Sequence, residues 1–180
     1  MNSDYPWYEL VAEPTYDLEQ GDLIYHCPVL VPEELPQLES IASGGSVRME
    51  VLSADLIVIS QTCDLAQDKL NQVVLCAHSS LSEIEHSLAI AKKKGRERIR
   101  QGTLPGYLML DACDAEGFEQ EIRVVDFRQV YTLPVKFVRT IAFRQGKRLR
   151  LLPPYREYLA QGFAKFFMRV GLPRDIPPFS

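Results

Sequence analysis

The sequence predicts a mostly β domain with α-helices, in the form of a small, curled, mainly antiparallel β-barrel decorated by helices. Two observations support this class. Seven or eight short runs of apolar or alternating residues are separated by Gly, Pro or acidic turns, which is the pattern of short strands. Only two long stretches and one short one repeat their apolar residues at helical spacing. Many short strands and few helices favour a small barrel over a layered parallel sheet.

Length and composition predict one domain with a terminal extension. A chain of 180 residues with 46% hydrophobic residues can bury one adequate core, and a second independent domain is not expected. We expect an acidic aromatic arm over residues 1–20, the barrel over 21–152 with a helical insertion at 81–101, and a C-terminal helix and tail over 153–180.

Several kinds of site and location are disfavoured by composition. No run of about 18 apolar residues exists, and the first residues lack a signal-peptide pattern, so we expect a cytoplasmic protein without membrane contact. The four cysteines are far apart, with no C-x-x-C pair and no His at ligand spacing. We therefore expect no disulfide framework, no metal site and no cofactor.

Charge is distributed unevenly along the chain. Residues 1–90 contain 15 acids and 2 bases, whereas residues 91–180 contain 9 acids and 18 bases, so their net charges are -13 and +9 and sum to -4. We expect the two halves to neutralise each other within one fold. A nucleic-acid partner for the basic half is the alternative.

The most informative segment lies in the first half, at residues 54–68. Four consecutive apolar residues at 56–59 predict a strand that is buried on both faces. The polar run that follows predicts a loop that faces something other than core; it consists of Ser60, Gln61, Thr62, Cys63 and Asp64. Other strands are expected at 23–27, ending at Pro28, at 47–51 and at 72–77. The strands at 54–60 and 72–77 are suited to antiparallel pairing.

A helix is expected from about residue 82. Ser82 and Glu85 have the spacing of a capping box, and apolar residues follow at helical spacing. The helix continues into a basic tract at 92–100, where Gly95 weakens it and only Ile99 is apolar. Strands are then expected at 107–110, 122–127 and 129–133, with an acidic turn at 111–121.

Two further helices are expected near the C-terminus. The first is short, starts at Pro134 and ends at Gly146. The second starts at the pair Pro153-Pro154 and ends near Gly171, and its apolar stripe consists of Tyr155, Leu159, Phe163, Phe166 and Val170. Because Phe166 and Phe167 are adjacent, they point about 100° apart. One of them is therefore available to a protein partner or to a second copy of the chain.

Four segments occur in an order that resembles the MazF/PemK family of toxins. They are Gly-Asp-Leu-Ile at 21–24, Leu-Ile-Val-Ile-Ser at 56–60, the segment at 73–80 and the segment at 125–133. The resemblance covers about residues 21–145. It implies an SH3-like barrel and cleavage of single-stranded RNA, with Ser79 or Ser80 at the position of the family's catalytic Thr or Ser.

This chain departs from the family at the position of its catalytic cation. The family has an Arg-Pro pair just before the central strand, where this chain has Ala54-Asp55. An acid at that position repels the phosphate that an arginine would hold. The basic insertion and the C-terminal helix are also absent from the toxins. We therefore expect a degenerate, non-catalytic relative that acts as a binding or accessory module in a toxin or defence system.

An enzyme is the first alternative. If the strand register brings them together, Cys63, Asp64 and His78 supply a thiol nucleophile, an orienting acid and a base, and Ser79 adds a hydroxyl. The chain would then be an RNA-cleaving or other hydrolytic enzyme. The structural alternative is that Thr62 and Asp64 turn the loop while Cys63 fills the mouth of the barrel.

Binding of single-stranded RNA or DNA is predicted by the basic tract at 92–100, together with Arg144, Lys147, Arg148 and Arg150. Phosphate contacts need little geometry beyond positive charge. The candidate contacts are Lys92, Lys93, Lys94, Arg96, Arg98 and Arg100, together with Gln61 and Thr62 on the polar loop. A solvated helix end or an unstructured loop is the alternative for such a tract. A partner-docking subunit that uses the C-terminal helix is the remaining function considered.

Overall fold

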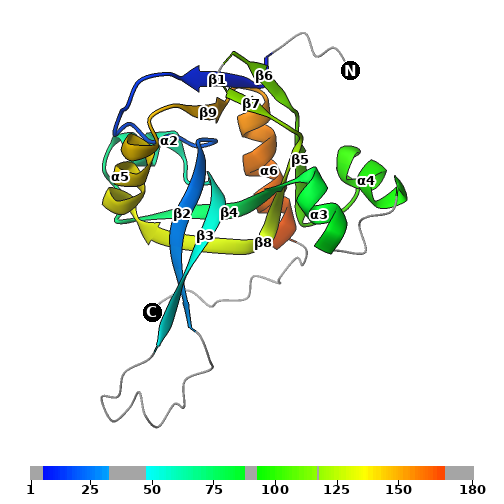
Figure 1. Cartoon of the computed structure of the whole chain (residues 1–180), viewed down its shortest axis with the longest axis horizontal. Helices are drawn as coiled ribbons and strands as arrows, with labels where there is room; N and C mark the ends of the chain where they lie inside the picture. Colours follow the sequence, from blue (N-terminus) through cyan, green and yellow to red (C-terminus); the bar gives the residue numbers. More distant parts are fainter. Residues whose placement is uncertain (1–5, 33–47, 88–92, 117, 169–180) are drawn as a thin grey trace, which may run out of the picture.

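The computed structural model describes residues 6–32, 48–87, 93–116 and 118–168, and within them the chain is mostly β with several helices. A five-stranded antiparallel sheet is the centre of the fold (Figure 1). Its order is β2 (Leu23–Pro32), β3 (Met49–Val58), β4 (Gln72–Ser80), β8 (Arg123–Pro134) and β5 (Tyr107–Leu110). Two small sheets pair β1 (Tyr8–Val11) with β9 (Arg148–Leu151) and β6 (Cys113–Ala115) with β7 (Phe118–Gln120).

The helices lie around this sheet. They are α2 (Thr62–Ala66), α3 (Leu81–Ser87), α4 (Lys93–Arg100), α5 (Val135–Gln145) and α6 (Tyr155–Phe167). The antiparallel, mostly β class is thus confirmed. Among the residues that the structure describes, none of the sheets closes into a barrel, so the SH3-like barrel remains a prediction.

Several strands are longer than the sequence patterns predict. Residues 47–51 and 54–60 were expected as two strands, but β3 is one strand that extends from Met49 to Val58. Likewise β8 runs through the expected break before residue 129. Its pairing with β4 shifts register between Cys76 and Ala77, so a bulge bends the ladder without ending it. Strand β2 continues past Pro28, which is tolerated because β2 lies at the edge of the sheet.

The core has two main parts, which alternate residues of β3 place on opposite faces of the sheet. Leu56 and Val58 belong to one apolar cluster, which includes Val138 of α5. Ile57 belongs to the other, which includes Leu159 of α6. The prediction that residues 56–59 are buried on both faces is therefore confirmed. The predicted antiparallel pairing of β3 with β4 is also confirmed.

The helices near the C-terminus follow their apolar periodicity. Helix α5 occupies the predicted segment between Pro134 and Gly146. In α6, Tyr155 and Leu159 are buried, and Phe163 and Phe166 pack against the same cluster. Phe167 is 59% exposed, although its ring also contacts those of Phe163 and Phe166, with ring centroids 5.0 and 4.9 Å apart. Val170 and Gly171, which complete the predicted stripe and stop, lie outside the described residues.

The start of α3 differs from the prediction in its cap. Glu83 accepts a hydrogen bond from the Ser80 backbone N–H at 2.8 Å, and Ser80 Oγ accepts one from the Glu83 N–H at 3.2 Å. The capping box is therefore Ser80 with Glu83, two residues before the predicted pair. The single predicted helix is also replaced by α3 and α4, and residues 88–92 between them lie outside the described part.

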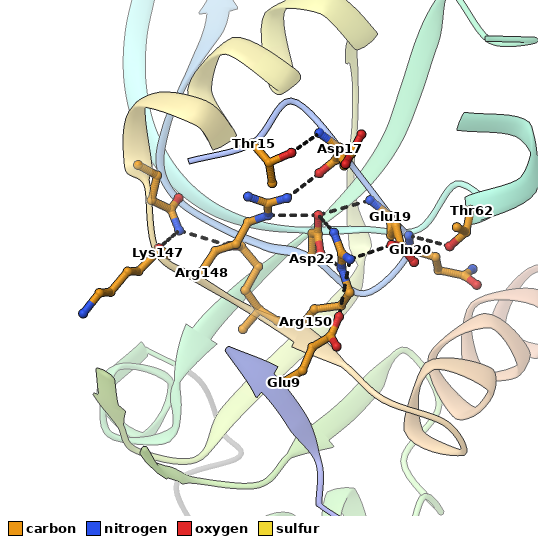
Figure 2. A network of polar contacts seen from close by, with 12 residues as sticks. Glu9, Thr15, Asp17, Glu19, Gln20, Asp22, Thr62, Lys147, Arg148 and Arg150 are labelled. Carbon is orange, nitrogen blue, oxygen red and sulfur yellow. Dashed lines mark hydrogen bonds and ion pairs between the residues drawn. The ribbon is translucent and has the colours of Figure 1, made fainter. Parts of the chain in front are cut away.

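The N-terminal arm is not the irregular segment that its composition predicts, because residues 8–11 form β1 against β9. Figure 2 shows the ion-pair network that joins this region to β9. Asp22 accepts hydrogen bonds from Arg148 Nε at 3.0 Å and from Arg150 Nη2 at 3.1 Å, and Asp22 and Arg148 are fully buried. Glu9 and Glu19, whose side chains are partly exposed, also form ion pairs with Arg150.

Ion pairs between the acidic and basic halves confirm the expected mutual neutralisation for several arginines. Each pair joins an arginine of residues 91–180 to an acid of residues 1–90. They are Arg123–Asp55, Arg139–Asp68, Arg148–Asp22, Arg150–Glu19 and Arg156–Glu19. A large part of the excess positive charge in the second half is therefore used inside the fold.

Candidate functional site

The polar run after β3 is held in place by contacts to the rest of the fold. Ser60 Oγ accepts a hydrogen bond from the Val74 N–H at 2.9 Å, and Thr62 Oγ1 accepts one from the Gln20 N–H at 3.2 Å. The run then enters the short helix α2, which starts at Thr62. Thr62 and Ser60 thus have a structural role. Gln61, the N-cap residue, is exposed.

Cys63 is exposed rather than buried, so the prediction that it fills a barrel mouth is wrong. Its Sγ lies 3.6 Å from Gln61 Oε1 and 3.8 Å from Asp64 Oδ1. Asp64 also lies 4.0 Å from Lys69 Nζ. A thiol is activated by a nearby imidazole or cation, and within the described residues Cys63 Sγ instead contacts an amide oxygen and a carboxylate.

The structure does not bring His78 and Ser79 to Cys63 and Asp64. Ser60, which lies just before α2, donates its backbone N–H to the carbonyl of Val74. His78 is four residues further along β4, about 13 Å at the usual rise of a strand. In addition, His78 and Ser79 are adjacent on β4, so their side chains point to opposite faces of the sheet. The predicted catalytic group is therefore not assembled.

His78 instead belongs to a buried group that the sequence analysis missed. Arg123 of β8 donates from Nε to His78 Nδ1 at 3.0 Å and from Nη2 to Asp55 Oδ2 at 2.6 Å. The ring of Tyr25 meets His78 edge-on, with 5.5 Å between ring centroids. Asp55 also accepts the His26 backbone N–H at 2.9 Å. The charge of Asp55 is thus balanced by an arginine from another strand.

The electrostatics of this group keep His78 neutral. Burial and then the adjacent Arg123 cation lower the pKa of His78 to about 3, although Asp55 acts in the opposite direction. The Nδ1 lone pair is occupied by the hydrogen bond from Arg123, so the ring proton resides on Nε2. With 2% of its surface exposed and a depressed pKa, His78 is unsuited to accept a proton from a substrate at neutral pH.

Ser79 lines a cavity of about 390 Å³ between β2, β3, β4 and β8. Asp55 and Glu83 line it as well, along with His26 and Tyr131. Neither lysine nor arginine lines this cavity in the part of the chain described. Because no cation on this lining can hold a phosphate, the surroundings of Ser79 do not suit the cleavage of RNA.

The basic tract forms an ordered helix in its second part. Helix α4 is anchored by Ile99, which is 2% exposed and packs in an apolar cluster with Tyr107 of β5. Lys94, Arg98 and Arg100 are exposed, and Arg96 is half-buried. Glu97 accepts a hydrogen bond from Arg100 Nε at 2.8 Å. Lys92 lies outside the described residues, as does the side chain of Lys93.

Beside α4 the surface has an apolar depression, which we call the α4 trough. One part, of about 770 Å³, is lined by Leu81, Met109 and Ile122 together with the side of α4 from Lys94 to Arg100. A second part, of about 570 Å³, adds Trp7, Leu110, Asp111 and Tyr155. The two parts adjoin each other, since both are lined by Arg100, Gln101, Met109 and Ile122. Its lining includes Met109 and Leu110 of β5, and this strand contacts both α4 and α6.

Comparison with models of known protein families found no match, and comparison with curated protein sequences found no similar protein. The site is therefore interpreted from its own geometry. None of the helices in the described ranges is long and apolar enough to cross a membrane. Within the same ranges, no three His, Cys, Asp or Glu side chains converge in a group that could hold a metal ion.

Sequence reasoning located the cations of α4 but missed the rest of the trough. Its lining comes from the N-terminal arm, α3, α4, β5 and α6, which are far apart in the chain. Gln61 and Thr62 are not among the residues that line it. The one available signal was the lone apolar residue of the tract, Ile99, which marks the buried side of α4.

Proposed function

We propose that the chain is a non-catalytic binding module that holds nucleic acid along α4 and its trough. The proposal includes a divergent MazF/PemK-like, SH3-like architecture. A place in a toxin or defence system follows from that resemblance alone.

Three features of the β3–β4 region support the loss of catalysis. The candidate nucleophile Cys63 and the candidate base His78 are far apart. The nearest cation, Arg123, is already paired with Asp55 at 2.6 Å and is therefore not available to a scissile phosphate. Among the described residues, neither lysine nor arginine lines the cavity beside Ser79. RNA cleavage at this position would need at least one of these features to be reversed.

The observation that carries nucleic-acid binding is the combination of exposed cations and an apolar depression on one surface. Lys94, Arg98 and Arg100 project from a helix that Ile99 fixes to β5. Unlike Arg148 and Arg150, Lys94 and Arg98 have no ion pair with an acid in the described residues. Cations on a formed helix attract phosphates without a further cost of ordering the backbone, and the adjoining apolar surface suits bases.

The proposal is tested by fluorescence anisotropy with a labelled 12-nucleotide RNA and the corresponding DNA at increasing salt. Affinity should fall with salt, and Lys94→Ala/Arg98→Ala should reduce the slope of log affinity against log salt by about 1.4, because two contacts are lost at roughly 0.7 each. Arg144→Ala/Lys147→Ala, which removes the same charge near the end of α5, is the matched control. Absence of binding, or an equal effect of both double variants, would refute the proposal.

A second candidate function is docking of a protein partner through α6. Tyr158, Phe167 and Met168 are 53%, 59% and 77% exposed, which is unusual for large apolar side chains. A homodimer formed through this face would be detected as a doubled mass in sedimentation. A monomer at all concentrations would rule out the homodimer.

A further inference from the structure

We infer that the second part of the α4 trough, which contains Trp7 and which we call the inner part, is a nucleobase pocket. A base of a single strand lies there against Trp7, while the adjoining phosphates contact α4. This inference rests on the proposed function. It adds which chemical group of the ligand enters the trough, and why the ligand is single-stranded.

Trp7 is held rigidly at the inner end of the trough. Its indole stacks on Tyr155, with 3.7 Å between ring centroids and 11° between planes. Its backbone carbonyl accepts the Leu152 N–H at 2.9 Å. Tyr155 itself is 7% exposed and belongs to the core, so the pair is fixed by α6. A ring that is already ordered loses little conformational entropy when a ligand packs against it.

The inner part is suited to a flat, mainly apolar ligand with polar edges. Met109, Leu110 and Ile122 supply apolar lining, and about 570 Å³ lies within the usual range of small-ligand sites. The lining also includes an amide, that of Gln101, and a carboxylate, that of Asp111. Gln101 Nε2 donates to Glu97 Oε1 at 2.6 Å, which orients the amide. This arrangement offers hydrogen-bonding atoms at the margin of an apolar surface.

Arg100 connects the base pocket to the phosphate-binding surface. It lines both parts of the trough, and its guanidinium is oriented by Glu97 through hydrogen bonds from Nε and Nη2. The cation therefore lies between the apolar inner part and the exposed Lys94 and Arg98. Successive nucleotides have the same alternation of apolar face and charged backbone. In a duplex the base faces are already stacked, so only a single strand can present one to Trp7.

The test uses the intrinsic fluorescence of Trp7, which is the single tryptophan of the chain. The wild-type protein is titrated with unlabelled 12-nucleotide single-stranded RNA, with a duplex of the same sequence, and with an abasic strand that retains every phosphate. We expect the intact strand to change Trp7 emission at the concentrations where anisotropy shows binding. The abasic strand should bind about 5- to 150-fold more weakly, the range for loss of one stacked base.

The outcomes separate this inference from the proposed function. If intact and abasic strands bind equally and Trp7 emission is unchanged, the base pocket is refuted while phosphate binding by α4 stands. If the duplex binds as tightly as the single strand, the inference is also refuted. If no nucleic acid binds, both proposals fail. Trp7→Ala should weaken binding of the intact strand and leave the abasic strand unaffected; the wild-type comparison decides the matter even if this variant does not fold.

Discussion

Two substitutions in the ion-pair network of Asp22, Arg148 and Arg150 should lower the free energy of unfolding by different amounts. Asp22→Asn removes the carboxylate that both guanidiniums share, so it leaves Arg148, which is fully buried, without its charged partner. Arg148→Met removes one guanidinium, and Asp22 keeps Arg150. Moreover, Arg148 Nη1 has no hydrogen-bond partner among the described residues, so the burial of this guanidinium is only partly compensated.

These differences translate into unfolding free energies. Breaking a buried pair so that a charge remains uncompensated costs about 3–5 kcal/mol, which we expect for Asp22→Asn. For Arg148→Met we expect about 1–2 kcal/mol, since the lost hydrogen bonds are partly offset by removal of an incompletely satisfied buried cation. For a chain of this size, 1 kcal/mol corresponds to about 2–4 °C in Tm.

The assay is urea unfolding at pH 7 followed by Trp7 fluorescence and by circular dichroism. The wild-type protein should be the most stable, Arg148→Met should be less stable, and Asp22→Asn should be the least stable. The double variant Asp22→Asn/Arg148→Met is informative, because removal of both members should cost less than the sum of the single changes. Equal effects of the two single variants, or an additive double variant, would contradict the reasoning from the shared carboxylate.

Three further predictions concern other parts of the molecule. The free energy of unfolding should fall as pH decreases from about 6.5 toward 3, by up to about 1.4 kcal/mol per pH unit, because the unfolded chain protonates His78 and the folded one does not. In a pH series of urea unfolding midpoints, His78→Asn should make this part of the curve flatter. Cys63→Ser should change stability by less than about 0.5 kcal/mol in the same assay, since the side chain is exposed, and a larger loss would show that the thiol has a structural role. Gly162→Ala should lower Tm, because a Cβ there would lie 2.9 Å from Phe127 Cε2 and displace the ring, at a cost of about 1–3 kcal/mol. An unchanged Tm would show that the ring moves freely.

Features determined by local pattern were predictable from the sequence. Four consecutive apolar residues at 56–59 indicate burial on both faces, and alternate members do join the two core clusters. Helix α5 was found because Pro134 and Gly146 mark its ends, and α6 because a proline pair marks its start; in both, apolar residues repeat at helical spacing. The cap of α3 was also readable: Ser80 and Glu83 have the same spacing as Ser82 and Glu85, and the choice between them depends on where β4 ends.

Features that depend on pairing between distant segments were not predictable. Strand β9 alternates Arg148 and Arg150 with leucines, so its charges disguise a buried strand until Asp22 is placed beside it. Arg123 reaches His78 only through the register of β4 against β8, which a bulge shifts between Cys76 and Ala77. A one-residue change in register reverses the face that a side chain occupies, so spacing in the sequence does not determine such a contact.

The same dependence on register explains the fate of the predicted catalytic group. The hypothesis that Cys63 meets His78 required a particular register between the two strands that flank the polar run. The antiparallel pairing of Leu56 with Ala77 instead places His78 near Asp55, before the buried run, while Cys63 follows that run. The cations of α4 could be found from sequence because electrostatic attraction depends on net charge more than on register.

The central claim is that this chain binds nucleic acid without cleaving it, and one incubation tests it directly. Labelled single-stranded RNA is mixed with the protein, the complex is isolated on a native gel, and the RNA recovered from the complex is analysed on a denaturing gel. We predict a salt-sensitive complex from which full-length RNA is recovered after prolonged incubation. RNA fragments that wild-type protein generates and that disappear with Ser79→Ala or His78→Asn, or the absence of any complex at low salt, would contradict the account.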